Sequence, residues 1–480
     1  MISRTLLAEA DELCRLGVAE LGAGFATGKF TPLEVTKATL ARAEVVQQRY
    51  NAFSLIDADM ALCMAEESTA RWRSGAPSSP IDGVPTTIKD IVWVKDRAVR
   101  YGSRTTSTQP CVQDAPSVKR LRAAGAILIG LTTTPEFGWK AVTESPLTGV
   151  TRNPWNPQTT PGGSSGGAVV AAVTGAGVLH IGTDGGGSIR RPACHTGLVG
   201  WKPSTGRFPR IDGLPAILND FETIGTLTRT LDDALLLDAA MAGPDARDRR
   251  SLYAQSPQQT RPKWRIIYIP TFGDSPVDPE VDAATAAVAE ALARDGHDVT
   301  EGKVFFDLED AGRIWHVISR AGVAWLMGWS KGRLDAAAGD NARAMAADGA
   351  KLTAADYVDA LERIAAFRRR CAETFATTDL ILTPTAAALP WPAETPYPNR
   401  IADRSAGPRD HAVFTGWVNI AGHPAINLPV AVSTAGLPIG VQFVAGFGAD
   451  TSLLAFAHTF SQQFPPPPIR LWNSDQSDGR

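Results

Sequence analysis

PGGSSGGAVVAAVTGAGVLHIGTDGGGSIRRP, residues 161–192, contains two glycine-rich serine segments separated by small apolar residues. GGSSGG occupies residues 162–167, and TDGGGSIR occupies residues 183–190, with Ser188 directly after three glycines. Glycine lets backbone amides turn inward because no Cβ blocks their approach. A hydroxyl in such a turn lies near several N–H donors, which is the geometry that attack on a carbonyl requires. A flexible Gly/Ser linker is the alternative, but the apolar segment and the following Arg-Arg-Pro disfavour it.

A serine nucleophile needs a base, which is most often histidine. The seven histidines of this chain lie in no recognisable catalytic motif. Lysine can act as the base when burial lowers its pKa toward neutrality. Lys89, in PIDGVPTTIKD at residues 80–90, is the best candidate because apolar and β-branched residues surround it in the sequence. An outward-facing lysine on a one-sided strand is the alternative interpretation.

Together with GVPTTIKD at residues 83–90, the segments GGSSGG and GTDGGGSIRRPA resemble the amidase signature family of serine hydrolases. The separation of Ser164 from Ser188 is similar to that between the middle serine and the nucleophile of this family. The resemblance extends over most of the chain. Further matching segments lie at residues 50–53, 225–234, 379–384 and 436–442. Such an ordered series is specific, whereas GGSSGG alone would not be.

The resemblance implies a Ser–Ser–Lys triad formed by Ser188, Ser164 and Lys89. Ser188 would attack the carbonyl, and Ser164 would relay the proton, its peptide bond with Gly163 being cis in the family. Lys89 must be neutral to act as the base, which requires burial and hydroxyl partners rather than a nearby carboxylate. Asp90 follows Lys89 directly, but successive side chains on a strand point to opposite faces, so Asp90 need not hold Lys89 charged.

The resemblance also implies an oxyanion hole and supporting residues. Asp184 and Arg190 are predicted to pair and brace the nucleophile loop, while Ser165 either positions Lys89 or is a turn hydroxyl. Relatives usually carry a larger residue at the position of Gly185, so this glycine makes room for a bulkier substrate or loosens the loop. The predicted oxyanion donors are the N–H groups of Gly185, Gly186, Gly187 and Ser188. The predicted supporting residues are Ser165, Thr183, Asp184 and Arg190.

Two tryptophans are candidate substrate residues. Trp139 falls where relatives place an apolar residue that lines the substrate pocket, although core packing explains it equally well. Trp315 belongs to the apolar segment 314–329, which forms either core or a wall of the substrate funnel. The proline-rich segment 384–409 is a candidate rim. These features favour an apolar, aromatic amide or carbamate as a hypothesis.

Residues 264–300 read as strand, helix and strand, which is typical of a parallel βαβ unit. We therefore expect an α/β protein with one large amidase-signature fold, whose mixed, largely parallel central sheet is covered by helices on both faces. The predicted domains are an N-terminal helical segment (1–75), an α/β core (76–464) with a candidate lobe boundary near 242–263, and a proline-rich, polar tail (465–480).

Composition excludes several function classes. The net charge of −3 and the lack of a long basic run argue against a nucleic-acid partner. Five scattered cysteines and an N-terminus without the apolar core of a signal peptide predict a cytoplasmic protein. Residues 166–182 are uncharged and approach the length of a membrane span. Their glycines, His180 and flanking turns favour a buried helix followed by a strand, so no membrane partner is expected.

Three functions compete. The first is a stand-alone hydrolase of an amide, anilide or carbamate. The second is the glutaminase component of a tRNA-dependent amidotransferase, whose relatives carry a polar, tyrosine-bearing segment before about residue 330. Here that place is apolar (residues 314–318 and 325–327), which favours the hydrolase. The third, a non-catalytic binding protein, is disfavoured because all three triad positions are occupied. Without HxH or HExxH spacing no metal is expected; no cofactor is implied, and a homodimer follows from the resemblance alone.

Overall fold

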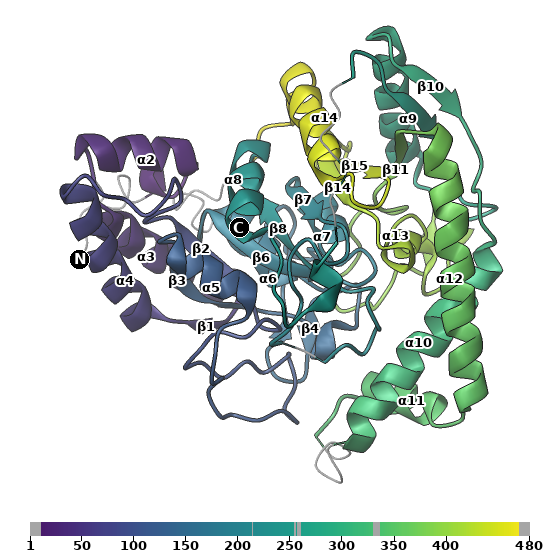
Figure 1. The fold of residues 1–480 in the computed structure, drawn as a ribbon, viewed down its shortest axis with the longest axis horizontal. Helices are drawn as coiled ribbons and strands as arrows, with labels where there is room; N and C mark the ends of the chain where they lie inside the picture. Colours follow the sequence, from purple (N-terminus) through teal and green to yellow (C-terminus); the bar gives the residue numbers. More distant parts are fainter. Residues whose placement is uncertain (1–10, 214, 254–255, 257–260, 330–336, 470–480) are drawn as a thin grey trace.

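A mixed sheet of 11 strands forms the centre of the computed structural model, which describes residues 11–213, 215–253, 256, 261–329 and 337–469 (Figure 1). The strands, in their order across the sheet, are β1 (Phe53–Ile56), β3 (Ile127–Thr132), β2 (Pro85–Lys89), β6 (Leu179–Asp184), β8 (Thr223–Thr228), β7 (Val199–Lys202), β14 (Ala425–Val432), β15 (Pro438–Ala445), β11 (Leu380–Pro384), β9 (Arg265–Tyr268) and β10 (Asp298–Glu301). Two small ribbons pair β4 (Glu144–Ser145) with β5 (Gly149–Val150) and β12 (Arg400–Ile401) with β13 (Arg404–Ser405).

Helices surround this sheet. In chain order they are α2 (Val18–Thr27), α3 (Pro32–Tyr50), α4 (Ala58–Arg73), α5 (Pro116–Ala123), α6 (Gly166–Thr174), α7 (Arg190–Thr196), α8 (Leu231–Met241), α9 (Pro279–Arg294), α10 (Leu308–Trp329), α11 (Asp340–Gly349), α12 (Ala354–Thr377), α13 (Gly416–Ala421) and α14 (Asp450–Gln463). In Figure 1, α2–α4 and α10–α12 lie at opposite ends of the molecule.

Both faces of the sheet are covered by helices, as predicted. On β3, Ile127 and Ile129 belong to a core cluster that includes residues of α3 and α6, whereas Leu128 belongs to another cluster that includes residues of α5 and α8. Neighbouring residues of a strand point to opposite faces, so these contacts lie on opposite sides of the sheet. The core is therefore built in layers around β3 and its neighbours.

The prediction of a largely parallel sheet is wrong at its centre. Parallel pairs join β3, β2 and β6 on one side and β11, β9 and β10 on the other. The strands between them, from β6 through β8, β7, β14 and β15 to β11, pair antiparallel. The strand–helix–strand unit at 264–300 is parallel as predicted, but it does not represent the whole sheet. Connections as short as the one between β14 and β15 can join only antiparallel neighbours.

In the described part of the N-terminal segment, residues 11–75, the helices α2, α3 and α4 are accompanied by one strand, β1, that the sequence analysis missed. Thr31 caps α3 with Pro32 in its first turn, and the Glu34 side chain accepts a hydrogen bond from the Thr31 N–H, as the sequence predicts. The strand β1 pairs antiparallel with β3 and forms an edge of the central sheet. The lobe boundary at 242–263 and the domain bounds stay predictions, and residues 254–255, 257–260 and 470–480 lie outside the described part.

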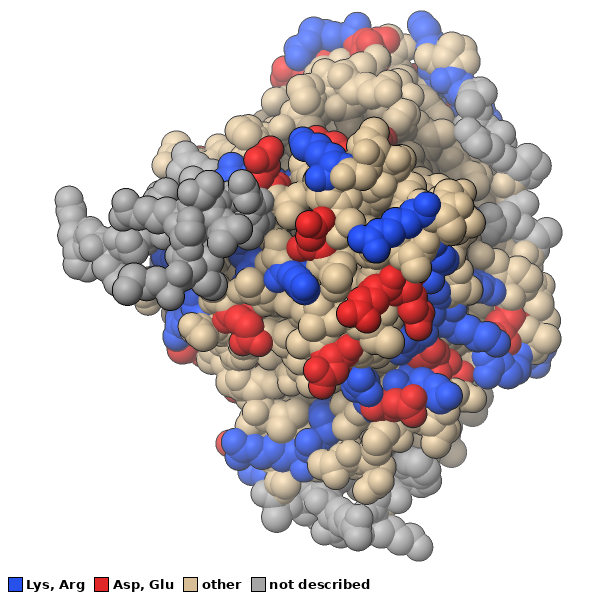
Figure 2. All heavy atoms as spheres, turned by 90° about the vertical axis from the view of Figure 1, so that its left-hand side faces the viewer, with Lys and Arg blue, Asp and Glu red and all other residues tan. Residues whose placement is uncertain are grey.

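The uncharged segment 166–182 forms the buried helix α6 followed by β6. Among the described residues, no helix is long and apolar enough to cross a membrane. On the face shown in Figure 2, acidic and basic side chains are interspersed.

Candidate active site

Lys89 ends β2, and its side chain is fully buried. Its Nζ donates hydrogen bonds to Ser164 Oγ at 2.7 Å, Thr183 Oγ1 at 2.9 Å and Ser165 Oγ at 3.0 Å. Ser165 Oγ in turn donates to the carbonyl of Thr183 at 3.2 Å. The structure thus brings the predicted base, the middle serine and two predicted supporting residues into one cluster.

The burial of Lys89 makes its neutral amine accessible near neutral pH. Burial lowers its pKa to about 7, although the charges of Glu222 and Asp184 act in the opposite direction. The neighbouring carboxylate of Asp90 is directed elsewhere, since its Oδ1 accepts a hydrogen bond from the N–H of Arg100 at 2.8 Å. No carboxylate of the described residues forms an ion pair with Lys89.

Ser164 and Ser188 line the same pocket. The peptide bond between Gly163 and Ser164 is cis, as the resemblance implies. Ser188 is 7% exposed, and its hydroxyl forms no hydrogen bond with the residues that the structure describes. Catalytic hydrogen bonds are often loose before the substrate binds. The Ser188 hydroxyl is therefore available to a molecule in the pocket.

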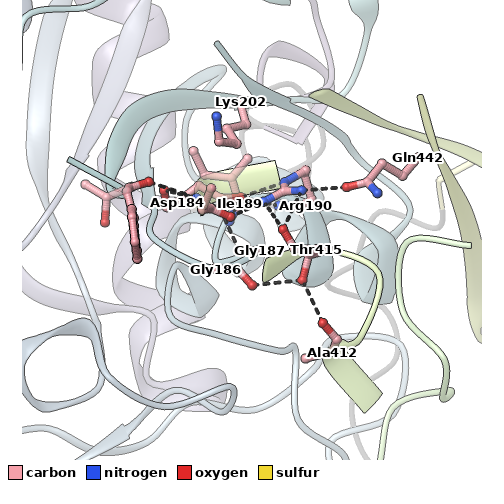
Figure 3. Close-up of polar contacts among 12 residues, drawn as sticks. Asp184, Gly186, Gly187, Ile189, Arg190, Lys202, Ala412, Thr415 and Gln442 are labelled. Carbon is pink, nitrogen blue, oxygen red and sulfur yellow. Dashed lines mark hydrogen bonds and ion pairs between the residues drawn. The ribbon is translucent and has the colours of Figure 1, made fainter. Parts of the chain in front are cut away.

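The loop that carries Ser188 is braced by Asp184 and Arg190, as predicted. Arg190 donates to Asp184 from Nε at 3.0 Å and from Nη2 at 2.8 Å, and to Gln442 Oε1 (Figure 3). It also donates to Asn419 Oδ1. Burial opposes ionisation of Asp184, but Arg190 outweighs it and holds the pKa of Asp184 below its ordinary value. Thr415 Oγ1 donates to the carbonyl of Gly186 at 2.8 Å and anchors the other side of the loop.

The hydrogen bonds that brace the loop occupy one of the predicted oxyanion donors and leave the others without an acceptor among the described residues. The N–H groups of Gly185, Gly186 and Ser188 have no acceptor among the described residues, and these three residues line the pocket. The N–H of Gly187 instead donates to Asp184 Oδ1 at 2.6 Å, so the prediction of Gly187 as a free donor is wrong. The reason is that a buried carboxylate recruits nearby donors, and the φ of +111° at Gly187 is a conformation that glycine readily adopts.

Trp315 and Trp139 both line the pocket. Trp315 lies so close to the loop that a Cβ on Gly186 would be 3.0 Å from its ring. It also packs with the core residue Phe221, so this part of segment 314–329 is both core and pocket wall. Trp325, by contrast, is exposed. At the end of the predicted rim, Arg409 lies over the Trp315 ring at 4.8 Å.

Several polar residues of the pocket were missed by the sequence analysis. Glu222, Lys140, Arg191 and His411 line it together with the residues above. Glu222 is paired with Arg210, and Lys140 is paired with Glu144. The only available signal was the second arginine of GSIRRP, because the others come from loops that carry no motif. Among the described residues, no group of three or more His, Cys, Asp and Glu is arranged to hold a metal ion.

We expect Arg190→Met to destabilise the protein by about 3–5 kcal/mol, since it leaves the buried Asp184 carboxylate without its counterion. The free energy of unfolding in urea measures this loss. Arg294→Met is the matched control, because Arg294 is exposed and its pair with Glu290 is worth at most about 1 kcal/mol. Equal stability of the two variants would show that Arg190 does not brace the loop.

The fold and the pocket define an α/β protein in which a buried lysine–hydroxyl cluster adjoins a glycine loop. The chain belongs to the amidase family, since the family model described as Amidase matches residues 34–454. Members of this family are hydrolases that act on amides.

Relatives of two kinds match this chain equally well. It is 31% identical over 482 residues to the A subunit of the glutamyl-tRNA(Gln) amidotransferase of Synechococcus sp. (strain WH7803), covering 93% of this chain and 97% of that one. It is also 31% identical over 469 residues to an acylamidase of Rhodococcus erythropolis, covering 94% and 96%. Among solved structures, a bacterial aryl acylamidase of the amidase signature family superposes with a TM-score of 0.86 at 25% identity, covering 94% and 96%.

Proposed function

We propose that this protein hydrolyses a carboxylic amide through an acyl-enzyme formed on Ser188. The observation that carries the proposal is the environment of the Lys89 amine. This amine is buried, is hydrogen-bonded to Ser164 Oγ at 2.7 Å and forms no ion pair with a carboxylate of the described residues. A buried amine with a pKa of about 7 is half neutral at neutral pH and can accept a proton. The same pocket contains the Ser188 hydroxyl and the unoccupied N–H groups of the glycine loop.

In the first step the oxygen of Ser188 bonds to the carbonyl carbon, and its proton passes to Ser164 while Ser164 gives its own proton to Lys89. The negative charge that develops on the carbonyl oxygen is stabilised by the N–H groups of Gly185, Gly186 and Ser188. Lys89 then returns the proton through Ser164 to the nitrogen of the substrate, which leaves as the amine when the C–N bond breaks. Water then attacks the acyl-enzyme: its oxygen bonds to the acyl carbon while its proton passes through the hydroxyls to Lys89. Return of that proton to Ser188 Oγ releases the carboxylic acid as the C–O bond to Ser188 breaks.

The substrate is a small amide, anilide or carbamate. The acylamidase and aryl acylamidase relatives support this class, as do Trp139 and Trp315 in the pocket. The alternative, a glutaminase component of an amidotransferase, has support from the amidotransferase relative. A glutamine site must hold an α-ammonium group, yet the pocket's described lining contains one carboxylate, Glu222, which is already paired with Arg210. We therefore favour the stand-alone hydrolase.

Labelling with a fluorophosphonate tests the nucleophile. We expect a single adduct by intact-mass spectrometry on the wild type and none on Ser188→Ala, because only an activated serine reacts quickly with this probe. Circular dichroism of both proteins checks that they are folded. An adduct that persists in Ser188→Ala would place the reactive group elsewhere and contradict the proposal.

A further inference from the structure

Arg191 is a buried cation without a partner among the described residues. It follows Arg190 on α7, lines the pocket beside Ser188 and is 8% exposed. Its guanidinium forms no hydrogen bond or ion pair with the part of the chain that the structure describes, and its buried Nε is unsatisfied. The carboxylate of Asp184 forms its ion pair with the neighbouring Arg190. A buried charge is costly unless it is paired, so a free guanidinium at this place is typical of a site that awaits an anion.

Two other donors of the same pocket also lack acceptors. Trp315 Nε1 and both ring nitrogens of His411 are buried without a hydrogen-bond partner among the described residues. Burial and the charge of Arg191 lower the pKa of His411 well below its ordinary value, so its ring is neutral and can still donate one hydrogen bond. Arg191, Trp315 and His411 thus offer buried N–H groups that have no acceptor among the described residues and that a substrate with acceptor oxygens can satisfy.

We propose that Arg191 binds a carboxylate of the substrate, so that the preferred substrates are amides that carry a carboxylate close to the scissile bond. This inference rests on the proposed amide hydrolysis and specifies its substrate class. A planar carboxylate matches the two parallel donors of a guanidinium. The described lining contains two other cations: Lys140 is paired with Glu144, and Arg409 lies over the Trp315 ring. Its one carboxylate, Glu222, is paired with Arg210. Trp139 and Trp315 would contact the apolar part of the same molecule.

Matched substrate pairs test this preference. Succinamate against butyramide places the carboxylate on the acyl part, and 4-acetamidobenzoate against acetanilide places it on the amine part. For at least one pair we expect kcat/KM to favour the charged amide by about 100-fold in the wild type, and by less than about threefold in Arg191→Met. Arg191→Lys should restore part of the preference, since it keeps the charge but loses the paired donors.

Lys140→Met is the matched control, because it removes a pocket cation that has a partner, and it should keep the preference. Three results would overturn the proposal. They are equal turnover of charged and neutral amides by the wild type, an unchanged ratio in Arg191→Met, and an equal loss of preference in Lys140→Met.

Binding and stability give readouts that do not need turnover. In Ser188→Ala, succinamate or 4-acetamidobenzoate should raise Tm, and Arg191→Met should abolish this rise; a rise that persists would contradict the proposal.

The Tm of unliganded Arg191→Met should equal or exceed that of the wild type, because an unpaired buried charge is removed. A fall of more than about 5 °C would show a structural role instead. Failure of fluorophosphonate labelling would count against the proposed hydrolysis, while these binding results would still decide the role of Arg191.

Discussion

Ser188→Ala lowers kcat/KM for any amide that the wild type hydrolyses by about 10⁵–10⁶-fold. The expected loss is this large because, in the proposed mechanism, the substitution removes the atom that would form the acyl-enzyme, and the residues proposed to act with it cannot replace it. Residual turnover comes from the N–H groups of Gly185 and Gly186, which still polarise the carbonyl. Steady-state kinetics with a single well-hydrolysed amide measures the effect.

Non-additivity provides the internal check. The double variant Ser188→Ala/Lys89→Met should be no slower than Ser188→Ala alone, since a base without its nucleophile contributes nothing. Ser117→Ala is the matched control, because Ser117 is a buried serine of α5 outside the pocket, and it should retain wild-type kcat/KM. A loss of less than about tenfold in Ser188→Ala would rule out covalent catalysis at this residue.

Lys89→Met is expected to lower kcat/KM by about 10⁴-fold, because the proton of Ser188 then has no acceptor beyond Ser164. In the wild type, kcat/KM should rise as pH increases through about 7 and then level off. The direction follows from the chemistry: the pKa of Lys89 is about 7, and only the neutral amine present above that value accepts a proton. A pH–rate profile from about pH 5 to 9 measures the midpoint.

Lys202 provides a close control for this profile. It is also fully buried, burial also lowers its pKa to about 7, and its Nζ donates to the carbonyls of Pro203 and His423. It does not line the pocket. The midpoint near pH 7 should therefore persist in Lys202→Met. Loss of the midpoint in this variant, or its retention in Lys89→Met, would show that Lys89 is not the titrating base.

Much of the fold could be predicted where local chemistry is strong. The capping of α3 by Thr31 and the buried strands β2 and β3 follow from signals within a few residues. The antiparallel centre of the sheet and the edge strand β1 were missed, because strand pairing depends on residues far apart in the sequence. The parallel strand–helix–strand unit at 264–300 did not indicate how the other strands of the sheet pair.

The candidate site shows the same division. The sequence by itself pointed to Ser188 and Lys89 through local features, a glycine turn and an isolated lysine, and to Ser164 through the resemblance to the amidase signature family. These three residues are the groups of the proposed mechanism. Only the tertiary structure decided that Asp184 takes the N–H of Gly187, since competition for a donor depends on three-dimensional distance.

Burial was also decided by the tertiary structure. The fold places Arg191, Trp315 and His411, which come from separate elements, around one pocket. The buried N–H groups of these three residues have no acceptor among the described residues. The free energy of an arginine depends on the partners and the solvent around it, and these are set by segments distant in the chain. The two arginines of GSIRRP are adjacent residues of the same type, yet Arg190 braces the loop with Asp184, whereas Arg191 lines the pocket without a partner in the part of the chain that the structure describes.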